Sequence, residues 1–145
     1  MRGEGGGGPF GVGPVVVLLL AATACISGTS LDDRPTEARV QVEGTASGPL
    51  RLVVSTDFHE ERTASGEVAR IIDVADTSQI TVPFEATILL GDLGGIIVEV
   101  SNTGSESAQL ALRVQLNRGH GEDVQEGSVP AGGMMRYFFL YYLGP

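Results

Sequence analysis

The fold class is decided by residues 96–116, IIVEVSNTGSESAQLALRVQL. Apolar side chains recur at every second position on both sides of a polar centre: Ile96, Val98 and Val100 before it, and Leu110, Leu112, Val114 and Leu116 after it. A period of two residues is that of a β-strand with one buried and one solvated face. The Asn, Thr, Gly and Ser positions between the two runs suit a turn. We therefore predict a hairpin of two strands at the centre of an all-β domain.

Similar short apolar runs recur through the rest of the chain, which has 145 residues and the length of one domain. Strands are expected at residues 39–43, 50–55, 67–74, 77–82, 86–90 and 134–143, with a charged loop at 59–66 and an acidic loop at 119–126. With the central hairpin this gives about eight strands, spaced as in a sandwich or barrel. The prediction is a single antiparallel β-sandwich of about 7–8 strands over residues 37–145.

Three segments of this predicted domain resemble a known family. They are VEVSNTG at residues 98–104, LRV at 112–114 and VPAGG at 129–133. Together they are similar to the CARDB-like, immunoglobulin-type modules of bacterial surface proteins, in which one strand ends in an N-T-G turn and a P-x-G turn precedes the final strand. The resemblance implies an Ig-like sandwich with a binding or spacer role, and it brings no catalytic residues.

The N-terminal segment has the pattern of a targeting signal. Its apolar run, residues 12–22 (VGPVVVLLLAA), is shorter than the roughly 20 residues that span a bilayer and has the length of a signal-peptide core. Ala22, Thr23 and Ala24 then lead into Cys25, the single cysteine of the chain. This order resembles the lipobox of bacterial lipoproteins, in which the signal is cut before a cysteine that carries diacylglycerol. An ordinary A-x-A cleavage site fits the same three small residues.

The lipobox resemblance implies a division of the chain and a location. Residues 1–24 would be the signal peptide, and residues 25–36 the lipidated Cys25 with a polar tether rich in Ser, Thr, Asp and Pro. The folded domain would then be held by lipid in a bacterial cell envelope, at the outer membrane on its periplasmic or surface face. The expected membrane contact is the lipid anchor itself.

The charge of the chain excludes one class of partner. The net charge is −9, and the chain contains no Lys. A nucleic-acid-binding protein needs a basic stripe to meet the phosphates, and docking on an anionic membrane needs basic clusters. We therefore predict no nucleic-acid partner, and we interpret the negative charge as a solubility feature.

Residues 59–63 come close to a catalytic motif without completing it. His59 begins an H-E-x-x-H pattern, but Thr63 stands where the second histidine is required. Ser55, Asp57 and His59 have the side chains of a catalytic triad, yet on one strand they would share its wet face about 7 Å apart. A triad needs hydrogen-bond contact, so we predict no catalytic residue here.

The predicted acidic loop offers carboxylates near a histidine. His120, Glu122, Asp123 and Glu126 could bind a cation, but their spacing matches no defined calcium site. We interpret the segment as a solvated acidic loop. No metal site and no cofactor are predicted.

The last predicted strand, residues 134–143 (MMRYFFLYYL), is apolar on both faces. A sandwich strand needs one apolar set, and Arg136 marks its own set as the outer one, because burying an unpaired charge is costly. Phe138, Leu140 and Tyr142 would then form an outer patch that meets a protein partner or a second copy. The alternative is a β-bulge that switches faces partway, so that both halves point inward.

These patterns favour one general function and leave two alternatives. The expectation is a lipid-anchored envelope protein that acts as a binding or structural module. A periplasmic carrier of a small apolar ligand is the alternative, and a deep, closed apolar cavity would favour it. An envelope enzyme is the third class, and it would need a polar constellation that the sequence does not display.

Overall fold

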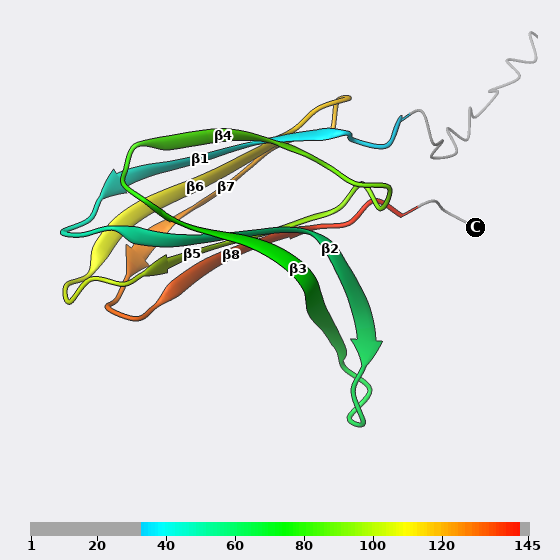
Figure 1. Ribbon diagram of the computed structural model, residues 1–145, viewed down its shortest axis with the longest axis horizontal. Helices are drawn as coiled ribbons and strands as arrows, with labels where there is room; N and C mark the ends of the chain where they lie inside the picture. Colours follow the sequence, from blue (N-terminus) through cyan, green and yellow to red (C-terminus); the bar gives the residue numbers. More distant parts are fainter. Residues whose placement is uncertain (1–32, 143–145) are drawn as a thin grey trace, which may run out of the picture.

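The computed structural model describes residues 33–142, which form eight strands and no α-helix. The strands are β1 (Glu37–Thr45), β2 (Leu50–Arg62), β3 (Val68–Ile80), β4 (Phe84–Leu89), β5 (Ile96–Asn102), β6 (Ala108–Leu116), β7 (Gly121–Val129) and β8 (Met134–Phe139). They build two four-stranded antiparallel sheets that face each other (Figure 1). The prediction of an all-β, two-sheet sandwich is confirmed.

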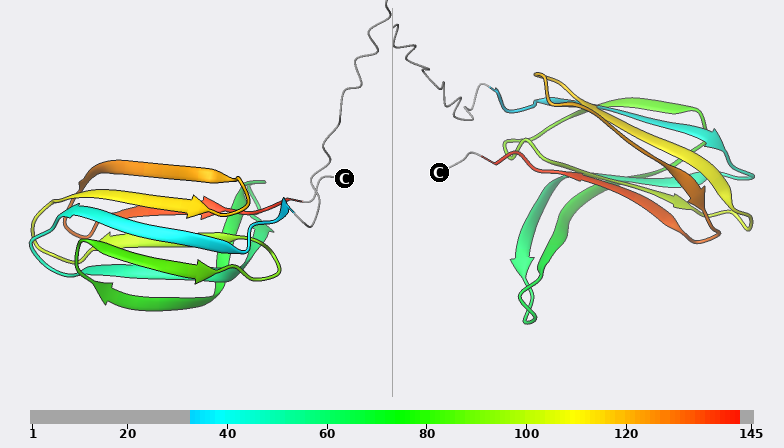
Figure 2. Two further views of the ribbon diagram at one scale, coloured as in Figure 1. Left: turned by 90° about the horizontal axis from the view of Figure 1, so that it is seen from above. Right: turned by 180° about the vertical axis from the view of Figure 1, so that it is seen from behind.

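Each sheet draws its strands from both halves of the chain. Sheet A has the order β4-β1-β6-β7, and sheet B has the order β3-β2-β5-β8. The two views of Figure 2 show the sheets as stacked layers, with β3 and β4 along one side and β7 and β8 along the other. Every strand pair in both sheets is antiparallel.

The predicted central hairpin is wrong in its pairing. β5 lies in sheet B between β2 and β8, whereas β6 lies in sheet A between β1 and β7. The polar segment between them therefore crosses from one sheet to the other. Alternation identifies the buried face of each strand but carries no information about its neighbour, and both strands bury their apolar set against the same core.

Other boundaries also differ from the sequence prediction. The runs at 67–74 and 77–82 belong to one strand, β3, and the expected charged loop at 59–66 contains the end of β2. The expected acidic loop at 119–126 is mostly β7. Both β3 and β7 are edge strands with many exposed side chains, so they lack the alternating apolar signal that revealed the central strands.

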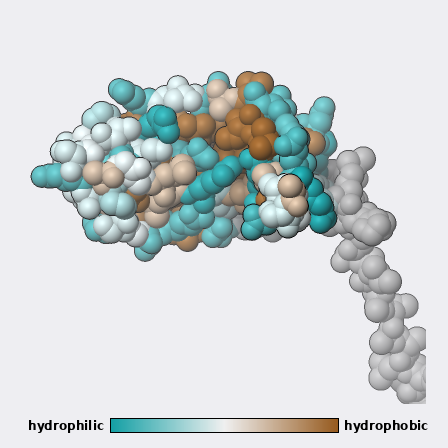
Figure 3. Space-filling model, turned by 90° about the horizontal axis from the view of Figure 1, so that it is seen from below, coloured by the Kyte–Doolittle hydropathy of each residue, from teal (hydrophilic) through white to brown (hydrophobic). Residues whose placement is uncertain are grey.

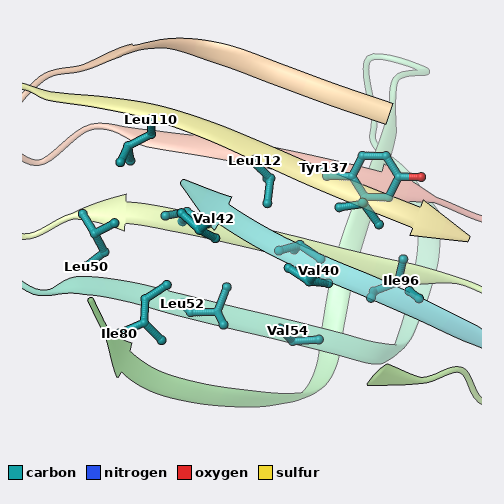
Figure 4. Packing of buried hydrophobic residues seen from close by; sticks show 14 of the residues in the cluster. Val40, Val42, Leu50, Leu52, Val54, Ile80, Ile96, Leu110, Leu112 and Tyr137 are labelled. Carbon is teal, nitrogen blue, oxygen red and sulfur yellow. The ribbon is translucent and has the colours of Figure 1, made fainter. Parts of the chain in front are cut away.

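The core fills the space between the two sheets (Figure 4). Sheet A contributes Val40, Val42 and Leu112, and sheet B contributes Leu52 and Val98 among others, all buried. The inner set of β8, which includes the buried Tyr137, packs against the same cluster. Desolvation of the phenol raises the pKa of Tyr137 to about 12. At about 1.5–3 kcal/mol for each fully buried Val or Leu side chain, this cluster is the main source of stability.

Candidate functional site

The sandwich is open along one side. The edge strands β3 and β4 stand apart there, whereas β7 and β8 approach each other on the opposite side. A cleft of about 520 Å³ lies between β3 and β4, and we call it the edge cleft. It reaches inward as far as Val40 of β1 and Leu52 of β2, so residues of the main core form its floor.

One wall of the edge cleft is apolar. Phe84, Ala86 and Ile88 alternate along β4, and each is half-buried. Leu89 lies at the rim with 73% of its side chain exposed. This wall therefore offers apolar side chains to whatever enters between the sheets.

The facing wall, on β3, is polar where a sandwich is normally apolar. The register Leu52↔Ser78 and Val54↔Asp76 places Ser78 and Asp76 on the same face as two buried core residues. Both side chains therefore face the cleft, and both are exposed. Asp57 adds a second carboxylate to the lining. Among the described residues that line the cleft there is no basic side chain.

A β-bulge in β2 places Asp57 at the cleft. The pairing passes from Val54↔Asp76 to Asp57↔Val74, so β2 holds one more residue than β3 at this point. Ser55 stabilises the bulge. Its Oγ lies 2.9 Å from the Asp57 carbonyl oxygen and 2.7 Å from the Val74 carbonyl oxygen. The same Oγ accepts a hydrogen bond from the Asp57 N–H at 3.3 Å. The expectation that Ser55 lies on a wet face is wrong, since it is 2% exposed.

Beyond the bulge, residues 57–74 of β2 and β3 leave the sandwich as a bent hairpin, which we call the arm (Figure 1). A second register shift follows directly, between Asp57 and Phe58. His59 lies on the arm, where its Nδ1 is 2.8 Å from an Asp73 carboxylate oxygen, and this hydrogen bond raises the pKa of His59. Ser55 is thus buried in the bulge, Asp57 lines the edge cleft and His59 lies on the arm, so the three residues considered for a triad are not brought together.

The arm is fastened to the outer face of sheet B at its base. Phe58 is 3% exposed and meets the Phe138 ring edge-to-face, with 5.6 Å between the ring centroids. The Arg70 guanidinium carbon lies 3.6 Å from the centroid of the same Phe138 ring. Glu60 accepts hydrogen bonds from Arg70 Nε at 3.2 Å and from the Tyr142 hydroxyl at 3.1 Å. The hydrogen bond to Glu60 raises the pKa of Tyr142.

The predicted patch therefore lies in the corner between the arm and sheet B. The expected strand over 134–143 is shorter in the structure, where β8 ends at Phe139, so Leu140 and Tyr142 follow the strand. Within β8 the inner and outer sets are as predicted, and the β5–β8 pairing advances one residue at a time from Ser101↔Met134 to Ile96↔Phe139. Phe138 and Leu140 are half-buried, and Tyr142 is 61% exposed. The arm of the same chain already contacts Phe138 and Tyr142. Binding of a partner at this patch stays a prediction.

Exposed hydrophobic surface also gathers near the arm. Figure 3 shows the molecule from the side on which the arm projects, with the strongest hydrophobic colour concentrated in one area rather than scattered. Val74 is 63% exposed, and Ile71 and Leu89 are also exposed. Because Val74 and Leu89 also line the edge cleft, its mouth is apolar.

The residues of the predicted acidic loop have structural contacts. His120 is half-buried, with its ring 5.6 Å from Phe139 and 5.5 Å from Tyr141 between centroids, and its Nε2 is 2.6 Å from the Asp33 carbonyl oxygen. Arg113 forms ion pairs with three glutamates: Glu43, Glu122 and Glu126. Within residues 33–142 no group of three or more His, Cys, Asp or Glu side chains is arranged to hold a metal ion.

The comparisons with known proteins add no assignment. No protein-family model, curated protein or solved structure matches the chain. The predicted lipidation residue, Cys25, lies outside the described residues. Between residues 33 and 142 no helix is long and apolar enough to cross a membrane.

Proposed function

We propose that the chain is a lipid-anchored protein of a bacterial cell envelope that acts as an interaction module and binds its partner at the edge cleft. The anchor rests on the lipobox-like sequence that ends in Cys25. The binding site rests on one observation: a cleft of about 520 Å³ lies between two edge strands, β3 and β4, and reaches down to buried residues of the core. A sandwich that served only as a spacer would gain stability by closing this side.

The shape of the cleft supports a protein partner. In the described sheets β3 has one neighbour, β2, and β4 has one neighbour, β1, so each presents a row of backbone groups at its outer edge. Such edges accept an added strand from another chain, which gains backbone hydrogen bonds while its alternate side chains fill pockets. The apolar wall of β4 and the core floor supply those pockets.

Site-specific photocrosslinking in the native envelope tests this proposal. A photoreactive residue is placed at Leu89, at Val74 or, as a control on the opposite side of the sandwich, at Val124 of β7, which is also exposed. We expect one discrete crosslinked partner at Leu89 and Val74 and none at Val124. Equal crosslinking at all three positions, or none at any, would contradict the proposal.

The size of the cleft favours one alternative, a carrier of a small apolar ligand. About 520 Å³ falls within the range of roughly 300–1,000 Å³ that is usual for ligand pockets. Mass spectrometry of the purified full chain distinguishes the two functions. A carrier would retain a small molecule near one equivalent and lose it in Ala86→Phe, in which the added ring enters the cleft.

A further inference from the structure

The two walls of the edge cleft have opposite chemistry. β4 contributes apolar side chains, and β3 with the bulge contributes Asp76, Ser78 and Asp57. A purely apolar occupant would leave two carboxylates partly desolvated without a partner, which is costly. An occupant that carries a cation among apolar groups would satisfy both walls.

An inward-pointing carboxylate on an edge strand has a second, protective use. Charged side chains that face inward at a sheet edge discourage unwanted strand pairing. Asp123 has this place on β7, where it is paired with Val114 on the core side, although β7 and β8 approach each other there. Asp76 differs because it stands beside an open cleft. A comparison of Asp76 with Asp123 therefore distinguishes a carboxylate that recognises a partner from one that only protects a sheet edge.

We infer that the edge cleft takes an extended segment of a partner protein that adds as a strand at β3 and directs one Lys or Arg side chain to Asp76. The inference rests on the proposed function and specifies its partner. Side chains two positions apart share one face of a strand. The segment therefore has the inward pattern apolar–cation–apolar, so that its apolar side chains meet Phe84 and Ile88 while its cation meets Asp76.

The choice of β3 follows from its chemistry. Residues 68–74 of β3 belong to the arm, so residues 75–80 form its edge beside the cleft, and this edge is no longer than β4. It is the edge that carries Asp76, the carboxylate that would meet the cation. The net charge of −9 further favours a cationic segment over an acidic one. A second copy of this chain would bring its own net negative charge to the same edge.

Three synthetic peptides test the inference against the full chain in phosphatidylcholine nanodiscs, with empty nanodiscs as the blank. The first peptide, acetyl-TLTKTVT-amide, places Leu, Lys and Val on one face. The second, acetyl-TLTETVT-amide, reverses the charge, and the third, acetyl-TLKTTVT-amide, keeps the composition but moves Lys to the other face. We expect calorimetric binding of the first peptide and binding about tenfold weaker, or weaker still, for the other two.

Matched variants of the chain assign the effect to Asp76. Asp76→Asn should remove most of the difference between the Lys and Glu peptides, and Asp123→Asn should keep it. N-methylation of the first peptide tests strand addition. Alternate N–H groups of an added strand point to opposite edges, so only the even-numbered or only the odd-numbered groups can bond to β3. One methylated form should lose binding and the other should keep it.

Several results would overturn the inference. These are equal affinity for all three peptides, an unchanged peptide preference in Asp76→Asn, or equal tolerance of both methylation patterns. Self-association of Asp76→Asn with unchanged peptide affinity would show that the carboxylate protects the edge. Dodecylamine that binds the cleft and is not displaced by the first peptide would identify a small amphiphile instead. Crosslinking at Leu89 without binding of the peptides would leave the proposed function standing and remove this inference alone.

Discussion

Arg70 lies over the Phe138 ring, with the guanidinium carbon 3.6 Å from the ring centroid, and this contact joins the arm to the last strand of sheet B. The same guanidinium donates through Nε to Glu60, which also accepts the Tyr142 hydroxyl. A cation over an aromatic face is worth about 0.5–1 kcal/mol at exposed sites. Arg70 therefore connects two aromatic residues of the C-terminal segment to a hairpin that otherwise leaves the sandwich.

The first prediction concerns the stability of the arm. Arg70→Ala should lower the free energy of unfolding by about 1 kcal/mol, because it removes the contact with Phe138 and the ion pair with Glu60. Amide hydrogen exchange along residues 57–74 should accelerate while the core strands stay protected. Arg62→Ala, near the tip of the same arm, is the control and should change neither quantity measurably. Unchanged exchange in Arg70→Ala would show that Phe58 and the Tyr142–Glu60 hydrogen bond hold the arm without Arg70.

The second prediction concerns the patch on β8. Phe138→Ser with Leu140→Ser should leave the sandwich folded, because neither side chain belongs to the core between the sheets: Phe138 lies on the outer face of sheet B, and Leu140 follows the end of β8. The variant should lose self-association or partner capture at this face, measured by sedimentation velocity and pull-down. Met134→Ser on the same outer face is the control. An unfolded double variant would place the patch in a core that includes Phe58, and the prediction would fail.

The third prediction uses a glycine that supports the same corner. An added Cβ at Gly95 would lie 2.7 Å from the buried Phe58 ring and 3.0 Å from a Leu140 methyl carbon. Gly95→Ala should therefore cost about 1–3 kcal/mol of stability through overpacking. Gly127→Ala is a matched control, because nothing lies within 4 Å of its added Cβ. Equal urea midpoints for both variants would show that Phe58 and Leu140 adjust to the added methyl group without loss of stability.

The sequence could predict the inner faces of the strands but not their partners. Val98 and Leu112 were identified as buried from alternation alone, and both lie in the core. Their strands nevertheless belong to different sheets, because pairing depends on contacts between distant segments. Ile97 shows that alternation does not always predict burial either. It points to the outer face of sheet B opposite Phe138, yet it is fully buried.

The edge cleft could not be predicted, because polar residues that face a cleft have the same sequence pattern as polar residues that face solvent. Val74, Asp76, Ser78 and Ile80 occupy alternate positions, and a polar pair inside such a set has the pattern of a strand end. The sequence interpretation broke β3 at this point. The bulge at Ser55 has no distinctive sequence pattern either, although it moves Asp57 to the cleft and Phe58 onto sheet B.

The fourth prediction concerns the anchor. Metabolic labelling with a fatty-acid probe should mark the wild-type chain and not Cys25→Ser, because the thiol is the acceptor in the proposed lipidation. The serine variant should also leave the membrane fraction, since stable anchoring needs acyl chains. Ser27→Ala, two residues further on, is the control and should be labelled like the wild type. Equal labelling of Cys25→Ser and the wild type would exclude a lipid anchor at this residue.

The last prediction concerns His59, whose pKa is raised above its ordinary value of 6.5 mainly by the hydrogen bond to Asp73. Because the folded-state pKa is the higher one, the protonated pair stabilises the fold fully below about pH 6.5, and this contribution is lost as the pH rises through the folded-state pKa. Asp73→Asn should lower the midpoint of the His59 ring resonances in an NMR titration. Glu61→Gln, which removes a more distant charge, should lower it less. Equal midpoints in Asp73→Asn and the wild type would show that the contact at 2.8 Å does not persist in solution.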